Sequence, residues 1–138
     1  MRQIPLFLAL ISTLTAADVF DAVCPAKGPV LQHVLETEEL LKQSSHCVSP
    51  KWPALARQAR IHGVVSLTIL VDREGKVNCV KLVKGHPLLV GASLDAARKW
   101  TFRPMTQGGR PVSFFGHLDF QFFMGGDIVP LPCTSARW

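Results

Sequence analysis

The fold is decided by residues 88–104, whose sequence is LLVGASLDAARKWTFRP. Apolar and small residues recur there at helical spacing, as on the buried face of a helix: Leu89, Ala92, Ala96 and Trp100. Pro104 then ends the segment, because proline fixes φ and has no N–H to donate. Trp100 and Phe102 can each bury a large area. The stretch therefore predicts a helix over 88–100 that packs on a neighbouring sheet.

A strand hairpin is predicted just upstream of this helix. Residues 64–71 are β-rich, and one face of the strand is wholly apolar: Val65, Leu67, Ile69 and Val71. Residues 72–76, DREGK, have turn chemistry in which Gly75 can adopt the left-handed conformation, and 77–83 form the return strand. Before the hairpin, Pro53 is suited to the first position of a helix that runs to Ile61, with Leu55, Ala56 and Ala59 on one face and Gly63 as its stop.

The last strand is predicted over 112–124, after a turn at 107–111. Its apolar face carries Leu118, Phe120 and Phe122, and its polar face carries His117, Asp119 and Gln121. The order is thus helix, hairpin, helix, strand. We expect an α+β fold, a small antiparallel sheet of about three strands with two helices packed on one face.

The N-terminal residues are typical of export. Arg2 is followed by an apolar run over 4–14 and by the small residues Thr15-Ala16-Ala17, which together predict a cleaved signal peptide over 1–17. The mature chain would then be periplasmic, and the alternative is an uncleaved inner-membrane anchor. The remaining divisions are a lead-in over 18–48, with a helix near 30–43, a domain over 49–124 and a tail over 125–138.

Four cysteines, an even number, favour disulfides in an oxidising compartment: Cys24, Cys47, Cys79 and Cys133. Three connectivities are open, of which Cys24–Cys47 with Cys79–Cys133 is preferred. The spacing contains no C-x-x-C pair, so no metal site is expected. The net charge is +5, but no basic run or basic–aromatic stripe indicates nucleic-acid binding.

Catalysis is disfavoured. Residues 91–95, GASLD, nearly match the G-x-S-x-G nucleophile elbow, but the last glycine is replaced by Asp95 and the stretch lies in a predicted helix. Asp95 and Asp119 could form a carboxylate pair only if the fold brought them together. We therefore expect no catalytic residues and no cofactor.

Several motifs in order resemble the C-terminal domain of TonB, the periplasmic energy transducer, over about residues 49–124. They are Trp52-Pro53-x-x-Ala56-Arg57, Gly63-Val64-Val65, Asp72-x-x-Gly75-Lys76-Val77, Pro87-Leu88-Leu89, Leu94-Asp95-Ala96-Ala97, Trp100-x-Phe102-x-Pro104 and Gly109-x-Pro111-Val112. The ordered combination is specific, above all the helix that runs into Trp-x-Phe-x-Pro. The short link of residues 18–48 differs from the long Pro-rich spacer of a full-length transducer, so energy transduction is not expected.

The resemblance implies that a partner's extended N-terminal segment, from an outer-membrane transporter or another envelope protein, adds as a strand to the last strand of the sheet. The residues implied in binding are His117, Leu118, Asp119, Phe120, Gln121, Phe122 and Phe123, together with Ser49, Pro50, Lys51 and Trp52. The alternative is a structural envelope module that self-associates, for example as a homodimer, through the same edge.

Overall fold

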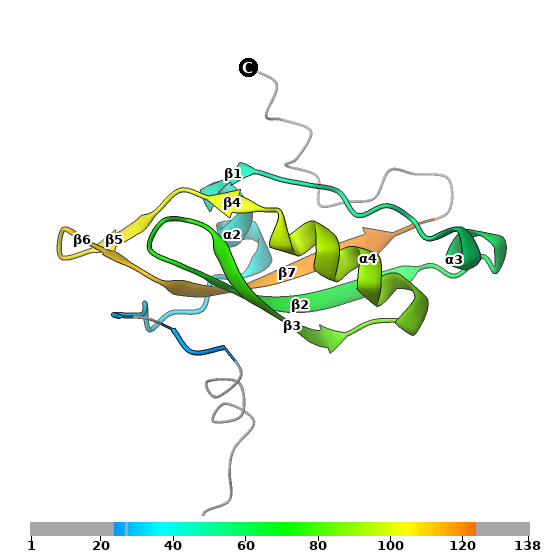
Figure 1. Cartoon of the computed structure of the whole chain (residues 1–138), viewed down its shortest axis with the longest axis horizontal. Coiled ribbons are helices and arrows are strands. Elements are labelled where there is room, and N and C mark those ends of the chain that lie inside the picture. Colours follow the sequence, from blue (N-terminus) through cyan, green and yellow to red (C-terminus); the bar gives the residue numbers. More distant parts are fainter. Residues whose placement is uncertain (1–23, 27, 124–138) are drawn as a thin grey trace, which may run out of the picture.

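A three-stranded antiparallel sheet forms the centre of the molecule. The computed structural model describes residues 24–26 and 28–123. The strands are β2 (Gly63–Val71), β3 (Val77–Lys84) and β7 (Phe114–Phe122), in the order β3-β2-β7 (Figure 1). Both pairings are antiparallel, and β7 pairs with β2 without a register shift from Gly63↔Phe122 to Val71↔Phe114.

In the described residues, three helices accompany this sheet: α2 (Thr37–Gln43), α3 (Ala54–Gln58) and α4 (Pro87–Arg98). α4 packs on β2 and β3, and α2 packs on β7 (Figure 1). Four short strands complete the connections, with β1 (Ser44–His46) paired to β4 (Thr101–Phe102) and β5 (Met105–Gln107) paired to β6 (Arg110–Val112). The predicted α+β class, with its small antiparallel sheet, is confirmed.

The core lies between the sheet and α4, as the apolar pattern predicts. The alternating residues of β2 and β7 are fully buried: Val65, Leu67, Ile69, Val71, Leu118, Phe120 and Phe122. Trp100 lies at the centre, with its ring 5.9 Å from that of Phe120 in a T-shaped arrangement and 6.0 Å from that of Phe102. The segment that decides the fold therefore links α4 to β7 through aromatic contacts.

The turn between β2 and β3 explains the need for Gly75. Its φ is +87°, and a Cβ at this position would lie 1.9 Å from the carbonyl oxygen of Phe102. The turn is closed by Asp72 Oδ1, which accepts hydrogen bonds from the N–H groups of Glu74 and Lys76. Because the carbonyl of Gly75 in turn accepts a hydrogen bond from the N–H of Phe102, the hairpin is fixed against the segment that follows α4.

The prediction for the first helix is wrong in its first half. Residues 29–35 are not helical: they form isolated bridges at Val30 and Leu35 with a bend at 32–33 between them, and the helix is confined to Thr37–Gln43. Glu36 is the N-cap of α2, and its N–H donates to Glu39 Oε2 at 3.3 Å, in a reciprocal capping box. Upstream of that cap the backbone groups pair with β7, so a helix cannot start at Val30.

The helix after Pro53 is shorter than predicted, and two details of its pattern are wrong. α3 ends at Gln58, and Arg60 takes a positive φ of 55° after it. Gly63 is thus the first residue of β2 and not the helix stop. Of the residues expected on one face, Ala56 is buried but Leu55 is 66% exposed, because a helix this short presents little more than one side chain to the core.

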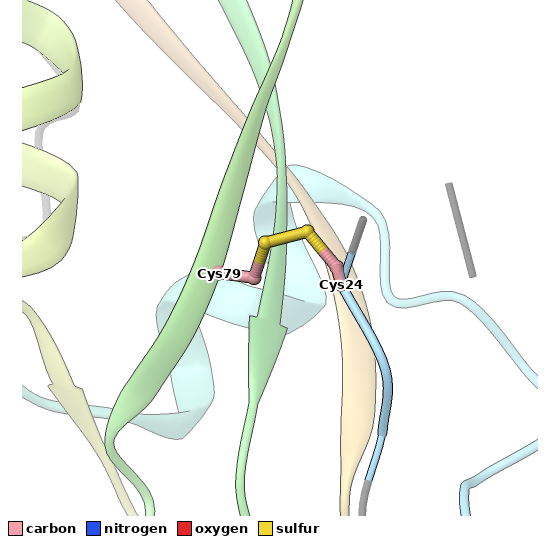
Figure 2. Close-up of a disulfide and its surroundings, with 2 residues drawn as sticks. All are labelled: Cys24 and Cys79. Carbon is pink, nitrogen blue, oxygen red and sulfur yellow. A yellow bond between two sulfur atoms is a disulfide. The ribbon is translucent and has the colours of Figure 1, made fainter. Parts of the chain in front are cut away.

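A disulfide joins Cys24 to Cys79, so the preferred pairing of Cys24 with Cys47 and Cys79 with Cys133 is wrong. Figure 2 shows Cys24, on the segment before residue 29, bonded across to Cys79 on β3. Cys79 pairs with Leu70 of β2, and both Cys24 and Leu70 are buried. The chain therefore crosses the face of the sheet opposite α4 before it reaches β7, a path that spacing alone does not reveal. Cys47 has no disulfide partner among the described residues, and Cys133 lies outside them.

The predicted signal peptide over 1–17 and the tail over 125–138 lie outside the described residues. Within residues 24–26 and 28–123, no helix is both long enough and apolar enough to cross a membrane.

Candidate functional site

The outer edge of β7, on the side away from β2, is the candidate site, and its first half is already occupied. Residues 29–37, here called the covering segment, run beside it, with parallel bridges Val30↔Ser113 and Leu35↔Gly116. The N–H of Leu31 donates to the carbonyl of Ser113 at 2.8 Å, and the N–H of His117 donates to the carbonyl of Leu35 at 2.9 Å.

Three further hydrogen bonds complete this pairing. The N–H of Ser113 donates to Pro29 at 3.1 Å, that of Leu35 donates to Phe115 at 2.9 Å, and Thr37 Oγ1 donates to the carbonyl of His117 at 3.0 Å. The backbone groups of Ser113 and His117 are therefore satisfied within the chain. The uncovered part of the outer edge is therefore shorter than residues 117–123, the range expected from the sequence.

The second half of the edge differs. Backbone groups in an antiparallel strand point alternately toward and away from the neighbouring strand. Since Ser113 and His117 point outward and the pairing with β2 has no register shift, Asp119 and Gln121 also point outward. In the part of the chain that the structure describes, no backbone hydrogen bond joins either residue to a further strand. Two outward N–H groups and two carbonyls thus form a short open edge.

The side chains of β7 divide between two faces. Leu118, Phe120 and Phe122 are fully buried, and their backbone groups point toward β2, so these three residues hold the strand in the sheet and do not face a partner. His117 and Asp119 are half-buried on the opposite face, and Gln121 is exposed there. His117 Nδ1 lies 3.2 Å from Thr68 Oγ1, which fixes its ring against β2. Phe123 follows the strand and is 46% exposed, an apolar surface at the open end.

The residues of the loop Ser49–Trp52 contact two different parts of the fold, the end of β7 and the surface of α4. The ring of Trp52 meets the ring of Phe122 edge-on, with 6.3 Å between centroids, so Trp52 lies at the end of β7. The loop is fixed nearby, because Trp100 Nε1 donates to the carbonyl of Val48 at 2.8 Å. Ser49, Pro50 and Lys51 instead line a hollow of about 240 Å³ against α4. Of the four, Trp52 contacts β7, at the end of the strand.

A carboxyl group at the start of α2 has a lowered pKa. The ring of His33, 3.1 Å from Glu39 Oε2, is the main cause that lowers the pKa of Glu39 below its ordinary value of 4.5, and the backbone N–H of Glu36 adds to the effect. These groups lie at the end of the covering segment. They hold the place where the chain turns from the edge of β7 into α2.

The residues weighed for catalysis have structural roles. Ser93 is buried in α4, and its hydroxyl donates to the carbonyl of Leu89 at 2.9 Å, as a packed helical serine does. Asp95 pairs with Arg98 at 3.4 Å on the exposed side of α4. Among the described residues, no cluster of three or more His, Cys, Asp or Glu could hold a metal ion.

The covering segment was missed by the sequence reasoning, although one signal pointed to it. Glu36-Thr37-Glu38-Glu39 has a glutamate at the third helical position after its cap, a pattern that marks a helix start at 37. Residues 29–35 would then have needed another explanation.

The fold defines a small α+β module with an antiparallel sheet, and comparison with known proteins gives its family. The family model described as "Gram-negative bacterial TonB protein C-terminal" matches residues 48–124. The chain belongs to this family. The expected resemblance is confirmed, and so is the expectation of a non-catalytic protein, which rests on membership of this family.

The relatives agree with this assignment. The chain is 31% identical over 81 residues to "Protein TonB" of Vibrio cholerae serotype O1, which covers 57% of this chain and 33% of that protein. It is 38% identical over 66 residues to "Protein TonB" of Xanthomonas campestris pv. campestris, covering 46% of this chain and 30% of that protein. The chain thus spans about a third of the length of these relatives.

A solved structure shares the fold. The solution NMR structure of the Pseudomonas aeruginosa TonB CTD superposes with a TM-score of 0.51 at 24% identity, covering 61% of this chain and 87% of that one. The TonB family faces the periplasm in the cell envelope, which agrees with the expected compartment. The family model begins at residue 48, so the covering segment lies outside the matched region.

Proposed function

We propose that this chain is a periplasmic protein-binding module that pairs with an extended N-terminal segment of an outer-membrane transporter or other envelope protein by strand addition at β7. The observation that carries the proposal is the open second half of the β7 edge, where the backbone groups of Asp119 and Gln121 point outward. Unpaired edge groups are a template for another strand. Family membership supports the choice of partner.

Trp52 supports the same location. It lies against Phe122 at the end of β7, and its indole Nε1 is buried without a hydrogen-bond partner among the described residues. Phe123, which follows Phe122 in the sequence, adds exposed apolar surface at this end of β7. A strand that pairs with Gln121 would therefore approach an aromatic surface, and such rings are enriched at protein interfaces.

A peptide titration tests this proposal. Synthetic peptides that copy the periplasmic N-terminal segments of outer-membrane transporters are added to the ¹⁵N-labelled mature protein, with scrambled peptides of the same composition as the control. The amide signals of Asp119 and Gln121 and the indole signal of Trp52 should shift with the native peptides only. Shifts confined to the hollow lined by Ser49, Lys51 and Lys99, or no shifts, would contradict the proposal.

The alternative is a self-associating structural module. Its support is β3, the other edge strand, where Val83 is 60% and Leu82 is 39% exposed. Sedimentation of the mature protein without any peptide distinguishes the two functions. A stable dimer whose formation protects the β3 amides favours the structural role, whereas a monomer that binds peptides favours recognition.

A further inference from the structure

The covering segment turns one strand edge into two unequal halves. Pro29 to Thr37 supplies a parallel neighbour for residues 113–117 of the β7 edge and none for residues 119–123. At Glu36 the chain leaves the edge and enters α2, so the pairing stops after His117. We infer that the covering segment is an internal strand that blocks the first half of the edge and confines a partner strand to residues 119–123. This inference rests on the proposed function.

Confining the partner strand to residues 119–123 limits its length and its composition. The open half spans five positions, about 17 Å at ~3.3–3.4 Å per residue. Only alternate positions, Asp119 and Gln121, offer outward backbone groups. The partner is therefore a short extended segment of about five residues, without proline at the positions that must donate to these carbonyls. A longer strand would meet Thr37 and Leu35.

Both ends of the covering segment are anchored. Upstream, the Cys24–Cys79 disulfide fixes the chain to β3 (Figure 2). Downstream, Leu35 is 5% exposed and Leu40 of α2 is fully buried against β7. A tether at each end keeps the local concentration of this strand at the edge high, so a free peptide competes poorly for the same groups.

The middle of the covering segment is less tightly packed. A hollow of about 510 Å³ is lined by Pro25, Ala26, Val30, Leu31, Gln32, Val34 and Phe115. Val34 is 36% exposed, and the hydrogen bonds to β7 skip residues 32–34. The disulfide is therefore the covalent upstream support of the pairing at Ser113, beside the packing of Leu31 against the core.

Amide hydrogen exchange of the full mature protein tests the two halves directly. In the free protein the amides of Leu31, Leu35, Ser113 and His117 should be protected, and those of Asp119 and Gln121 should exchange quickly. Equal protection of Asp119, Gln121 and His117 would overturn the inference, because another segment or a second copy would then cover the open half.

The same transporter peptides are then added. Protection should appear at Asp119 and Gln121 while Leu31 and Leu35 keep theirs. If peptide binding exposes Leu31 and Leu35, the covering segment is displaced and confinement is wrong. If the peptides change the exchange of no amide, the proposed function fails. The hydrogen exchange measured without peptide still decides whether the covering segment blocks the first half of the edge.

The tether is tested by Cys24→Ser with Cys79→Ser, and the matched control is Cys47→Ser, at a cysteine without a disulfide partner among the described residues. Exchange at Leu31 and Ser113 should become at least about tenfold faster in the double variant. The inward amides of Gly116 and Leu118 should keep their protection, which shows that the sheet persists. Unchanged exchange at Leu31 and Ser113 would overturn the role of the disulfide as the upstream support.

Discussion

Residues 113–117 and 119–123 belong to one edge, yet among the described residues only the first group has a neighbouring segment on its outer side. They share the same pairing with β2 and the same buried apolar face. What separates them is the covering segment, which bonds to Ser113 and His117 and then leaves the edge at Glu36. That segment precedes the residues that match the family model. Hence the family fold supplies the edge, and a segment outside it decides how much of the edge is free.

The largest expected loss of stability comes from a substitution in the core that lies beneath both halves of the edge. Phe120 is fully buried and meets Trp100 at 5.9 Å between ring centroids. Phe120→Ala should lower the free energy of unfolding by about 3–5 kcal/mol, because the cavity adds to the lost burial. Chemical denaturation measures this loss. Gln121→Ala, next in sequence but exposed, is the control and should change it by less than about 0.5 kcal/mol.

A substitution of intermediate expected effect, Gly116→Ala, should loosen the covered half of the β7 edge and leave the open half unchanged. Gly116 faces Leu40 of α2, and a Cβ there would lie 2.6 Å from Leu40 Cδ1 and 3.2 Å from its Cγ. Because Leu40 is fully buried, Gly116→Ala should push α2 away at a cost of about 1–3 kcal/mol. The amide of His117, bonded to Leu35 just before α2, should exchange faster, while that of Gln121 should not change.

Gly91→Ala is the matched control for that substitution. A Cβ at Gly91, in α4, would meet nothing within 4 Å. Alanine in a helix should therefore stabilise the protein by about 0.5–1 kcal/mol. If Gly116→Ala behaves like Gly91→Ala, α2 does not hold the covering segment against β7.

The smallest expected effect is the pH dependence of stability that arises from Glu39. The pKa of Glu39 is lowered, first by the hydrogen bond to His33. The stabilisation from this carboxylate is therefore present above the ordinary pKa of 4.5 and is lost as the pH falls through the lowered value. In His33→Ala the pKa of Glu39 should rise toward 4.5, as carbon-detected titration of its carboxyl would show. An unchanged pKa would mean that His33 does not hold this turn.

The sequence predicts well what depends on local pattern. The alternation in β2 and β7 and the helical spacing before Trp100 are sufficient to place the sheet and α4, because burial on one face demands these periods. The non-helical course of residues 29–35 and the Cys24–Cys79 bond depend on where the chain crosses the sheet. Val30, Leu31, Val34 and Leu35 have helical spacing, but tertiary hydrogen bonds to β7 prevail over it. The edge was therefore found from the sequence, and its covered half was not.

The binding of transporter peptides to Gln121→Pro, compared with Gln121→Ala, tests most directly whether the open half of the β7 edge is the binding site. The N–H of Gln121 points outward, so proline removes a group that a partner strand needs while sparing the pairing with β2. Calorimetry should show affinity at least about tenfold weaker for Gln121→Pro and nearly unchanged for Gln121→Ala, with both variants folded by circular dichroism. Asp119→Pro, at the other outward position, provides the same test if Gln121→Pro fails to fold. Full affinity in a folded proline variant would contradict strand addition at residues 119–123.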